Sequence, residues 1–243
     1  MQNWLIINPN TSAGITQALL QRVAARTQGL ARCQAATARF GAPYIASEAS
    51  YAVAGHAVLD AWACHEQTLA GRDARPDAYL VGCFGDPGVA ALQEVTGRPV
   101  IGLAEAAFAE ASAFGRFAIV TGGARWQPML HKLALAQGYG LRLAGLHMLD
   151  ATGAELAADP ERARTRLRLA CEQAARDFAA DAVILGGAGL AGLADGWYDQ
   201  LAVPVIDSVD AGARQLLARS AAWHADTAEP PLPPHPALLA WPR

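Results

Sequence analysis

Cys83 is the side chain of this sequence whose surroundings best suit proton transfer or nucleophilic attack. It follows a short apolar segment and lies within Gly82-Cys-Phe-Gly-Asp-Pro-Gly88. Asp86 is suited to cap a helix and Pro87 to occupy its first turn, so we expect a helix to begin here. The dipole of that helix would lower the pKa of the thiol. Cys83 is then a candidate base or nucleophile, and the alternative is a thiol that packs as a small hydrophobe.

Three other apolar segments also end in polar or glycine-rich residues. Ile7-Asn-Pro-Asn-Thr-Ser12 carries amide and hydroxyl groups, and Thr11 or Ser12 suits a helix cap. Thr121-Gly-Gly-Ala124 and Gly186-Gly-Ala-Gly189 offer backbone N–H groups to an anion or an enolate oxygen. Ordinary turn formation is the alternative for each segment. The predicted substrate-binding residues are Asn8, Asn10, Thr11, Phe84, Gly85, Thr121, Gly122, Gly187, Ala188 and Gly189.

The remaining cysteines and the histidines do not indicate a metal site. Cys33, Cys64 and Cys171 lie in helical or early-strand contexts and are expected to pack as hydrophobes. No CxxC pair and no pair of histidines has the spacing of metal ligands, so we predict that no metal is bound. Gly187-Ala-Gly-Leu-Ala-Gly192 matches the dinucleotide pattern GxGxxG, with Asp207 following, but it occurs too late in the chain for a dinucleotide-binding fold.

Charge and hydrophobicity limit the partners of the protein. The chain has 243 residues, a formal net charge of −3 and a pI of about 6.1, so we expect no binding to nucleic acid. The N-terminus lacks the pattern of a signal peptide, and Ala182–Ala194 is too short to cross a bilayer. We therefore expect a cytoplasmic protein that acts on a small molecule and does not contact membranes. The Pro-rich segment from Glu229 is expected to form an extended strap.

Short apolar segments alternate with Ala- and Leu-rich helical stretches along the chain. This alternation predicts an α/β fold with parallel sheets, in which ligands bind at the carboxyl ends of strands. The expected strands are Trp4–Ile7, Ala78–Val81, Val100–Leu103, Phe117–Val120, Leu141–Leu146, Ala182–Leu185 and Val203–Ile206.

An internal repeat divides the chain into two halves. Asp77-Ala-Tyr-Leu-Val-Gly-Cys-Phe-Gly85 aligns with Asp181-Ala-Val-Ile-Leu-Gly-Gly-Ala-Gly189, and a Pro-Val-Ile segment follows each of them. In this alignment Gly187 is the counterpart of Cys83. We predict two pseudo-symmetric α/β lobes with an active-site cleft between them. The predicted lobes comprise residues 1–97 with 206–243, and residues 98–205.

Four segments together resemble the Asp/Glu/hydantoin racemase family, and most closely its hydantoin and allantoin racemase branch. The likeness runs over about residues 3–215 and rests on Ile7–Ser12, Gly82–Gly88, Gly102–Ala107 and Leu185–Ala191. The resemblance implies flavodoxin-like lobes, a homo-oligomer, and proton transfer without a cofactor at a carbon next to a carbonyl. It also implies one cysteine in each lobe, one to remove a proton and the other to return one. Cys83 matches the first of these cysteines.

Gly187 stands where the family pattern has its second cysteine. Glycine has no side-chain proton to give, so a symmetric pair of thiols cannot form. One-cysteine decarboxylases of the wider superfamily resemble the opposite arrangement, in which the second-lobe cysteine is kept. Three interpretations follow. The first is a racemase or epimerase of a hydantoin-like or amino-acid-derived substrate, in which another group or a water assists Cys83. The second is a one-thiol isomerase, decarboxylase or lyase, and the third is a non-catalytic small-molecule binder. We expect the first, an isomerase.

Overall fold

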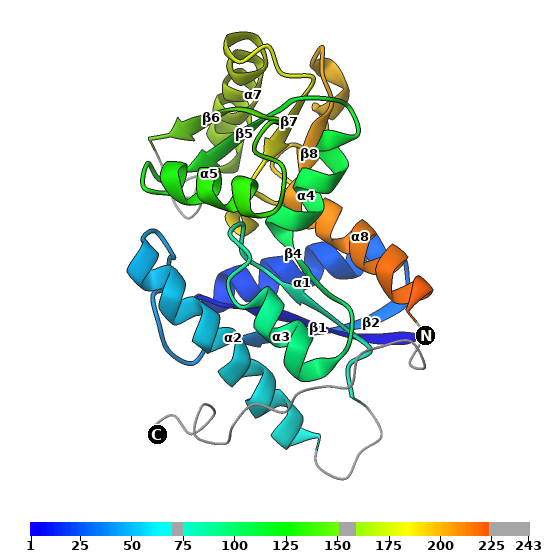
Figure 1. Cartoon of the computed structure of the whole chain (residues 1–243). Coiled ribbons are helices and arrows are strands. Elements are labelled where there is room, and N and C mark those ends of the chain that lie inside the picture. Colours follow the sequence, from blue (N-terminus) through cyan, green and yellow to red (C-terminus); the bar gives the residue numbers. More distant parts are fainter. Residues whose placement is uncertain (70–74, 151–158, 224–243) are drawn as a thin grey trace. The chain divides into compact units, whose positions relative to one another are not determined.

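The computed structural model of the chain describes residues 1–69, 75–150 and 159–223 (Figure 1). These residues form two compact α/β units, each built on a parallel sheet of its own. Unit 1 comprises Met1–Gly102 and the chain from Ala213 onward, and unit 2 comprises Leu103–Gly212. The strap predicted from Glu229 lies outside the described residues.

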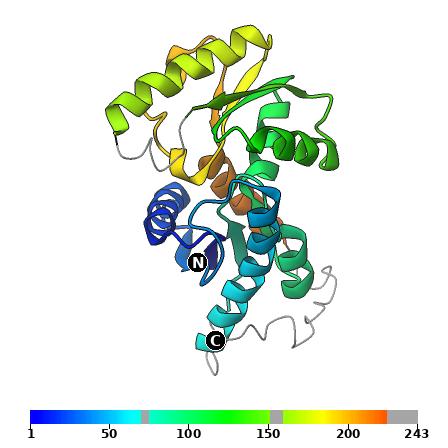
Figure 2. The same ribbon diagram turned by 90° about the vertical axis from the view of Figure 1, so that its left-hand side faces the viewer.

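Unit 1 is a four-stranded parallel sheet covered by helices on both faces. Its elements are β1 (Gln2–Asn8), α1 (Ala13–Thr27), β2 (Ala31–Thr37), α2 (Glu48–Thr68), β3 (Ala78–Val81), α3 (Val89–Thr96) and β4 (Val100–Gly102). The strand order is β2-β1-β3-β4. α1 lies on one side of the sheet and α2 and α3 lie on the other, where Val58 and Leu92 share a core with Leu5 (Figure 2). Burial on both faces explains the almost wholly apolar sequence of β3.

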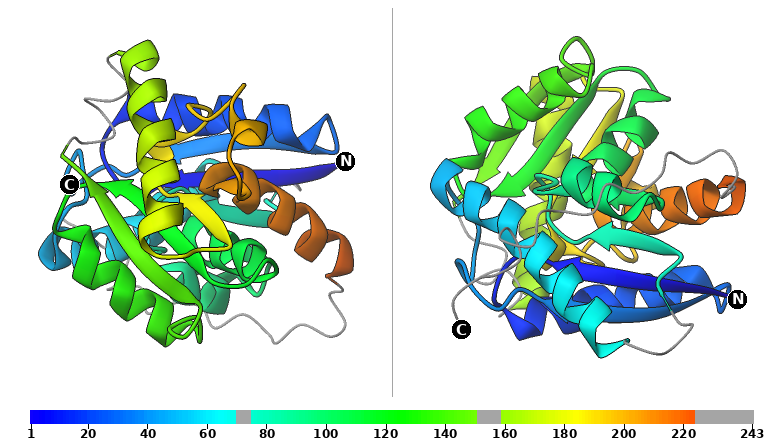
Figure 3. Two further views of the ribbon diagram at one scale, coloured as in Figure 1. Left: turned by 90° about the horizontal axis from the view of Figure 1, so that it is seen from above. Right: turned by 60° about the horizontal axis from the view of Figure 1, so that its bottom comes forward.

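Unit 2 repeats this architecture. Its elements are α4 (Leu103–Ser112), β5 (Phe117–Gly122), α5 (Trp126–Ala136), β6 (Leu143–Leu149), α7 (Pro160–Asp177), β7 (Ala182–Leu185), the 3-10 turns η1 (Ala188–Leu190) and η2 (Tyr198–Gln200), and β8 (Val205–Asp207). The strand order is β6-β5-β7-β8, which is the order of unit 1 with each strand replaced by its counterpart. α7 lies on one face of this sheet (Figure 3), where Leu167 and Cys171 pack against Val183.

The helix α8 (Ser208–Ala222) begins in unit 2 and continues into unit 1. It contains the helix predicted near Asp210–Ser220. Its last turns are tied to the first strand of unit 1, because the Ser220 hydroxyl donates to Gln2 Oε1 at 2.7 Å and Gln2 Nε2 donates to the Ser220 carbonyl at 3.2 Å.

In each unit an aspartate links the starts of the two central strands through the same two hydrogen bonds. In unit 1 the Asp77 N–H donates to the Asn3 carbonyl at 2.7 Å, and the Asp77 carboxylate accepts the Asn3 N–H at 2.8 Å. In unit 2 the Asp181 N–H donates to the Arg116 carbonyl at 2.7 Å, and its carboxylate accepts the Arg116 N–H at 2.8 Å. The aligned aspartates of the sequence repeat therefore have one structural role.

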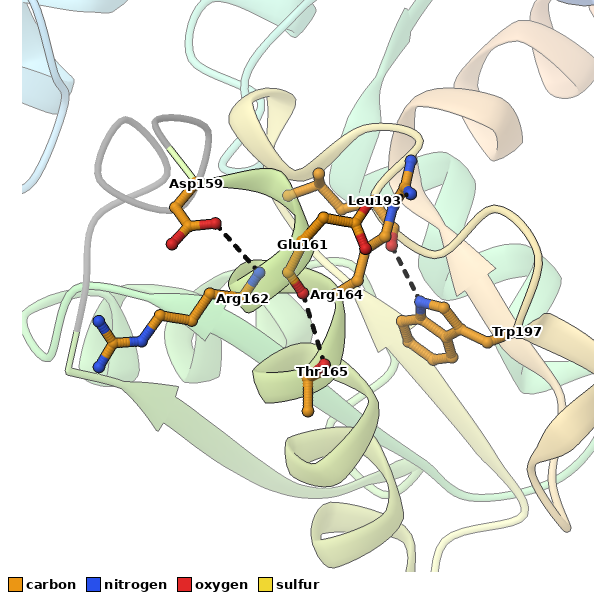
Figure 4. Close-up of polar contacts among 7 residues, drawn as sticks. All are labelled: Asp159, Glu161, Arg162, Arg164, Thr165, Leu193 and Trp197. Carbon is orange, nitrogen blue, oxygen red and sulfur yellow. Dashed lines mark hydrogen bonds and ion pairs between the residues drawn. The ribbon is translucent and has the colours of Figure 1, made fainter.

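The start of α7 shows how local sequence sets a helix end. The Asp159 side chain caps the helix by accepting the Arg162 N–H at 3.2 Å (Figure 4). In the first turn, the Glu161 carboxylate contacts Arg164 at 2.9 Å and the Glu161 carbonyl accepts the Thr165 hydroxyl at 3.4 Å. The negative charge of Glu161 also complements the helix dipole at this end.

The α/β class and the two-lobe repeat are confirmed, whereas several strand limits differ from prediction. β6 begins at Leu143 and extends to Leu149, and Leu103 begins α4 instead of ending a strand. The strand β2 was not predicted. Its sequence Ala-Arg-Cys-Gln-Ala-Ala-Thr has few β-branched residues, and its composition is more typical of a helix. None of the helices among the described residues has the length and hydrophobicity that crossing a membrane requires.

Asp77→Ala is expected to lower the free energy of unfolding by about 1–2 kcal/mol, because a part-buried charged hydrogen bond is lost. Asp181→Ala is the matched control, and its loss should be smaller because the equivalent bond is exposed. Urea unfolding of both variants tests this. A midpoint for Asp77→Ala equal to that of the native chain would show that the aspartate contact does not stabilise unit 1.

Candidate active site

The predicted site residues of both units lie at the carboxyl ends of strands. In unit 1, Asn8 ends β1 and Cys83 follows β3 by two residues. In unit 2, Thr121 lies at the end of β5 and Gly187 follows β7 by two residues. The Gly82 N–H donates to the carbonyl of Ile7 at 2.8 Å, and the corresponding Gly186 N–H donates to that of Val120 at 3.0 Å. The chain therefore has the same backbone hydrogen bond after β3 in unit 1 and after β7 in unit 2.

Backbone hydrogen bonds fix the turn that carries Cys83. The Cys83 N–H donates to the Val81 carbonyl at 3.0 Å, and the Cys83 carbonyl accepts the N–H groups of Gly85 at 2.9 Å and Asp86 at 3.1 Å. Two glycines near this turn have no room for a side chain. A Cβ at Gly82 would overlap Leu19 of α1, and a Cβ at Gly88 would lie 2.8 Å from the Gly55 carbonyl of α2.

The expected helix start at Asp86 and Pro87 is wrong. α3 begins at Val89, and its N-cap is Gly88, whose φ of 74° suits glycine. Asp86 precedes the cap in a left-handed conformation with φ 56°. Pro87 therefore lies in a turn before the helix, and Cys83 is six residues away from the first helical residue.

The expectation that the pKa of Cys83 is lowered is also wrong. Burial, which leaves Cys83 9% exposed, raises the pKa of the thiol, and the negative charge of Asp86 raises it further. The helix dipole falls off within the first turn of a helix, and α3 begins too far along the chain to oppose these effects. Both effects favour the neutral thiol over the thiolate.

Asp86 contributes a buried carboxyl group to this turn. It is 7% exposed, and its carboxyl group lies directly against Gly102 at the end of β4, where any Cβ would overlap it. Asparagine and aspartate tolerate the left-handed backbone better than most residues. A glycine at 102 and a residue that accepts positive φ at 86 are thus both needed to hold the carboxyl group there.

Tyr51 of α2 completes the surroundings of the turn and was missed by the sequence analysis. Its hydroxyl donates to the Gly85 carbonyl at 2.8 Å. Burial raises the pKa of Tyr51 to about 12, with smaller contributions from Asp86, Cys83 and Glu48. Its position in the first turns of a helix that follows a strand was the available signal, because such turns lie at the carboxyl edge of the sheet.

Asn8 is occupied by contacts within its own loop. It is fully buried, and its Nδ2 lies 2.9 Å from Asn10 Oδ1, 3.0 Å from the Ser12 carbonyl and 3.0 Å from Thr16 Oγ1. Its Oδ1 accepts the Asn10 N–H at 3.2 Å. Ser12 is the predicted cap of α1, and its side chain accepts the Ile15 N–H. Asn8 is thus a residue that shapes the loop.

Among the described residues, the corresponding end of the unit 2 sheet has hydroxyl groups and no thiol. Gly187 has φ 138°, and a Cβ there would make only ordinary contacts, at 3.7 Å from Leu190 and 3.9 Å from Thr121 Oγ1. The Gly187 N–H donates to Ser208 Oγ at 3.1 Å, so it is already engaged in this structure. The expectation that N–H groups near Gly122 and Gly187 bind an enolate oxygen stays a prediction.

The glycine pattern that follows β7 serves the packing of unit 2. Ala188–Leu190 form a 3-10 turn where a dinucleotide fold would have a helix. The buried Asp207 carboxylate accepts the Gly192 N–H at 2.8 Å and the Val209 N–H at 2.8 Å. This aspartate therefore caps α8 and fixes the glycine-rich loop.

Comparisons with known proteins agree with this arrangement. The family model "Asp/Glu/Hydantoin racemase" matches residues 5–216. A hydantoin racemase of Paenarthrobacter aurescens is 33% identical over 211 residues, which cover 86% of this chain and 87% of that protein. A hydantoin racemase of a Pseudomonas species (strain NS671) is 31% identical over 210 residues, covering 86% and 82%. The structure of an allantoin racemase from Klebsiella pneumoniae has a TM-score of 0.81 and 32% identity, covering 91% of this chain and 88% of that one.

The chain belongs to the Asp/Glu/hydantoin racemase family.

Membership of the Asp/Glu/hydantoin racemase family confirms the predicted resemblance and the enzyme class, an isomerase of the racemase type. Among the other cysteines, Cys171 is fully buried in the core of unit 2, and burial raises its pKa to about 12. Cys33 and Cys64 are half-buried thiols. Within the described ranges, no three His, Cys, Asp or Glu side chains gather as metal ligands would.

Gly187→Ala is expected to destabilise the protein by about 1–3 kcal/mol, because a φ of 138° strains any residue with a Cβ even where space exists. Gly14→Ala in α1 is the matched control and should be neutral or stabilising by up to about 1 kcal/mol, since this helical glycine has no positive φ. Thermal or urea unfolding measures both. Equal stabilities of the two variants would contradict this account of Gly187.

Proposed function

We propose that this chain is a cofactor-independent racemase or epimerase that uses Cys83 as an acid–base group. The reacting centre is a carbon next to a carbonyl in a hydantoin-like or amino-acid-derived substrate. The observation that carries the proposal is the Cys83 turn, in which hydrogen bonds and glycine contacts hold a thiol at the carboxyl end of a central strand. The names of the relatives, hydantoin racemase and allantoin racemase, support this substrate class.

The reaction needs little besides well-placed proton donors and acceptors. Loss of the C–H proton gives a carbanion whose charge spreads onto the neighbouring carbonyl oxygen as an enolate. Return of a proton to the other face of that carbon inverts its configuration. A positioned acid or base contributes about 10²- to 10⁴-fold to such a step, and no cofactor is required.

The polar groups of the strand ends are proposed to bind the substrate. Asn10 uses its Oδ1 to accept Asn8 Nδ2 and the Ser12 N–H, and among the described residues its Nδ2 makes no such contact. Asn10 Nδ2 can therefore donate to a ring carbonyl. Asn8 acts through Asn10 by fixing that side chain. Thr11, Phe84, Gly85, Thr121, Gly122, Gly187, Ala188 and Gly189 are the further proposed binding residues.

Incubation of one enantiomer of a 5-substituted hydantoin in D₂O is expected to bring deuterium into the C5 position with loss of optical activity. Cys83→Ala should lower this exchange by at least about 10²-fold, because the acid–base group is removed. Cys64→Ala is the matched control and should exchange at the native rate, because Cys64 lies on α2 outside the Cys83 turn. Native-level exchange by Cys83→Ala, measured by NMR, would remove the thiol from the mechanism.

A second candidate function is protonation of an enolate on one face by Cys83 alone, as in a one-thiol isomerase, decarboxylase or lyase. Two observations favour it. Burial and the charge of Asp86 favour the protonated form of the Cys83 thiol, and Gly187 supplies no second acid–base side chain. A neutral thiol is a competent acid but must first lose its proton to act as a base.

The pH dependence of turnover distinguishes the two candidates. Because the pKa of Cys83 is raised, proton removal by its thiolate should accelerate about tenfold per pH unit without levelling at the ordinary thiol value of about 8.5. We expect this slope in kcat/KM for the racemase, measured from about pH 6 to pH 9. If kcat/KM does not change with pH, Cys83 acts as an acid alone, as in the second candidate. If kcat/KM reaches a plateau near pH 8.5, the pKa of Cys83 is not raised.

We also propose that the enzyme acts in the cytoplasm as a homo-oligomer, and that neither nucleic acid nor membranes are its partners. Its acidic pI and its family membership support these proposals.

A further inference from the structure

The titratable groups around the buried Cys83 thiol come from its own turn and from α2. Asp86 lies on the same turn, and Tyr51 approaches from α2, where Glu48 in turn acts on Tyr51. From α1 and β4 the turn meets Leu19 and Gly102, neither of which titrates. In this part of the chain, Asp86 is therefore the charged group that acts directly on the thiol.

The backbone of Asp86 is built to keep its carboxyl group in place. The residue has φ 56°, its N–H donates to the Cys83 carbonyl at 3.1 Å, and its carbonyl accepts the Val89 N–H at 3.4 Å. The carboxyl group is pressed against the bare Cα of Gly102. Aspartate tolerates a left-handed backbone better than most residues, so this turn can hold the carboxyl group in place.

We propose that Asp86 is the positioning residue that keeps Cys83 in its proton-donating form in the resting protein. Its negative charge, fixed over Gly102, opposes formation of the thiolate within the water-poor turn. Cys83 then enters the reaction as S–H. A water molecule first takes up the substrate C–H proton and leaves an enolate; the S–H bond then breaks as the new C–H bond forms on the other face, and the sulfur is left as thiolate. The thiolate takes back a proton from the hydronium ion formed in the first step, which completes the cycle.

This inference rests on the proposed function for its place in catalysis, but the state of the thiol is measurable without substrate. Iodoacetamide reacts with thiolates, so its rate at a fixed neutral pH reports the thiolate fraction at each cysteine. Peptide mass spectrometry separates Cys83 from Cys64, which serves as an internal reference on α2.

Asp86→Asn keeps the shape of the side chain and tolerates the same backbone. Removal of the charge should raise the thiolate fraction at Cys83 about tenfold, and the lower nucleophilicity of the less basic sulfur reduces the gain in alkylation rate to about threefold. Glu48→Gln is the matched control, because it removes a nearby charge that acts on Tyr51, and it should leave the Cys83 rate unchanged. Cys64 should be unaffected in both variants.

An unchanged Cys83 rate in folded Asp86→Asn protein would overturn the proposal, and so would an equal acceleration by Glu48→Gln. If Asp86→Asn does not fold, Gly102→Ala provides the second variant, because the new methyl group must displace the carboxyl group. Acceleration in that variant would support the proposal, and an unchanged rate would overturn it. Absence of hydantoin exchange by the native chain would instead refute the proposed function and leave the alkylation result standing.

Discussion

Burial of the Cys83 turn is the constraint on which the proposed chemistry of this thiol depends. Leu19 closes one side of the turn at Gly82, and the backbone of α2 closes another at Gly88. A charge on a buried sulfur loses its hydration, so the free energy of the thiolate rises. The thiol is then a weaker acid than it is in water. The same burial strengthens the effect of Asp86, because charges interact more strongly at low dielectric.

The repeat shows which parts of this arrangement belong to the scaffold and which to the chemistry. Asp77 and Asp181 join their strands with the same pair of hydrogen bonds, and both sheets have the same strand order. The residues that differ lie where each sheet ends. Asn8 corresponds to Thr121 and Cys83 to Gly187, so the scaffold is duplicated while the proposed reactive groups are not. The φ of 138° at Gly187 is one that residues with a side chain rarely adopt.

Sequence reasoning predicted the architecture well because buried parallel strands leave a strong apolar signal. It failed for β2, an edge strand in which polar Arg32 and Gln34 alternate with small residues. It also offered Ser12 as one of two caps for α1, which the structure confirms, and Cys83 as the acid–base group, which stays a prediction. It misjudged the electrostatics of Cys83, because Asp86 and Pro87 resemble a helix start, whereas the backbone makes a further turn first and α3 begins at Val89. Tyr51 was missed because its contact with Gly85 spans 34 positions, although its place in the first turns of α2 gave a local signal.

The protonation state of Cys83 in the free protein is the property that tests this account most directly. The infrared absorption of its S–H group can be isolated as the difference between the native chain and Cys83→Ser, recorded from neutral to mildly alkaline pH. We predict an S–H band that persists above the ordinary thiol pKa of about 8.5, since burial and Asp86 both oppose ionisation. A band that is absent at neutral pH, or that disappears near or below that ordinary value, would contradict it.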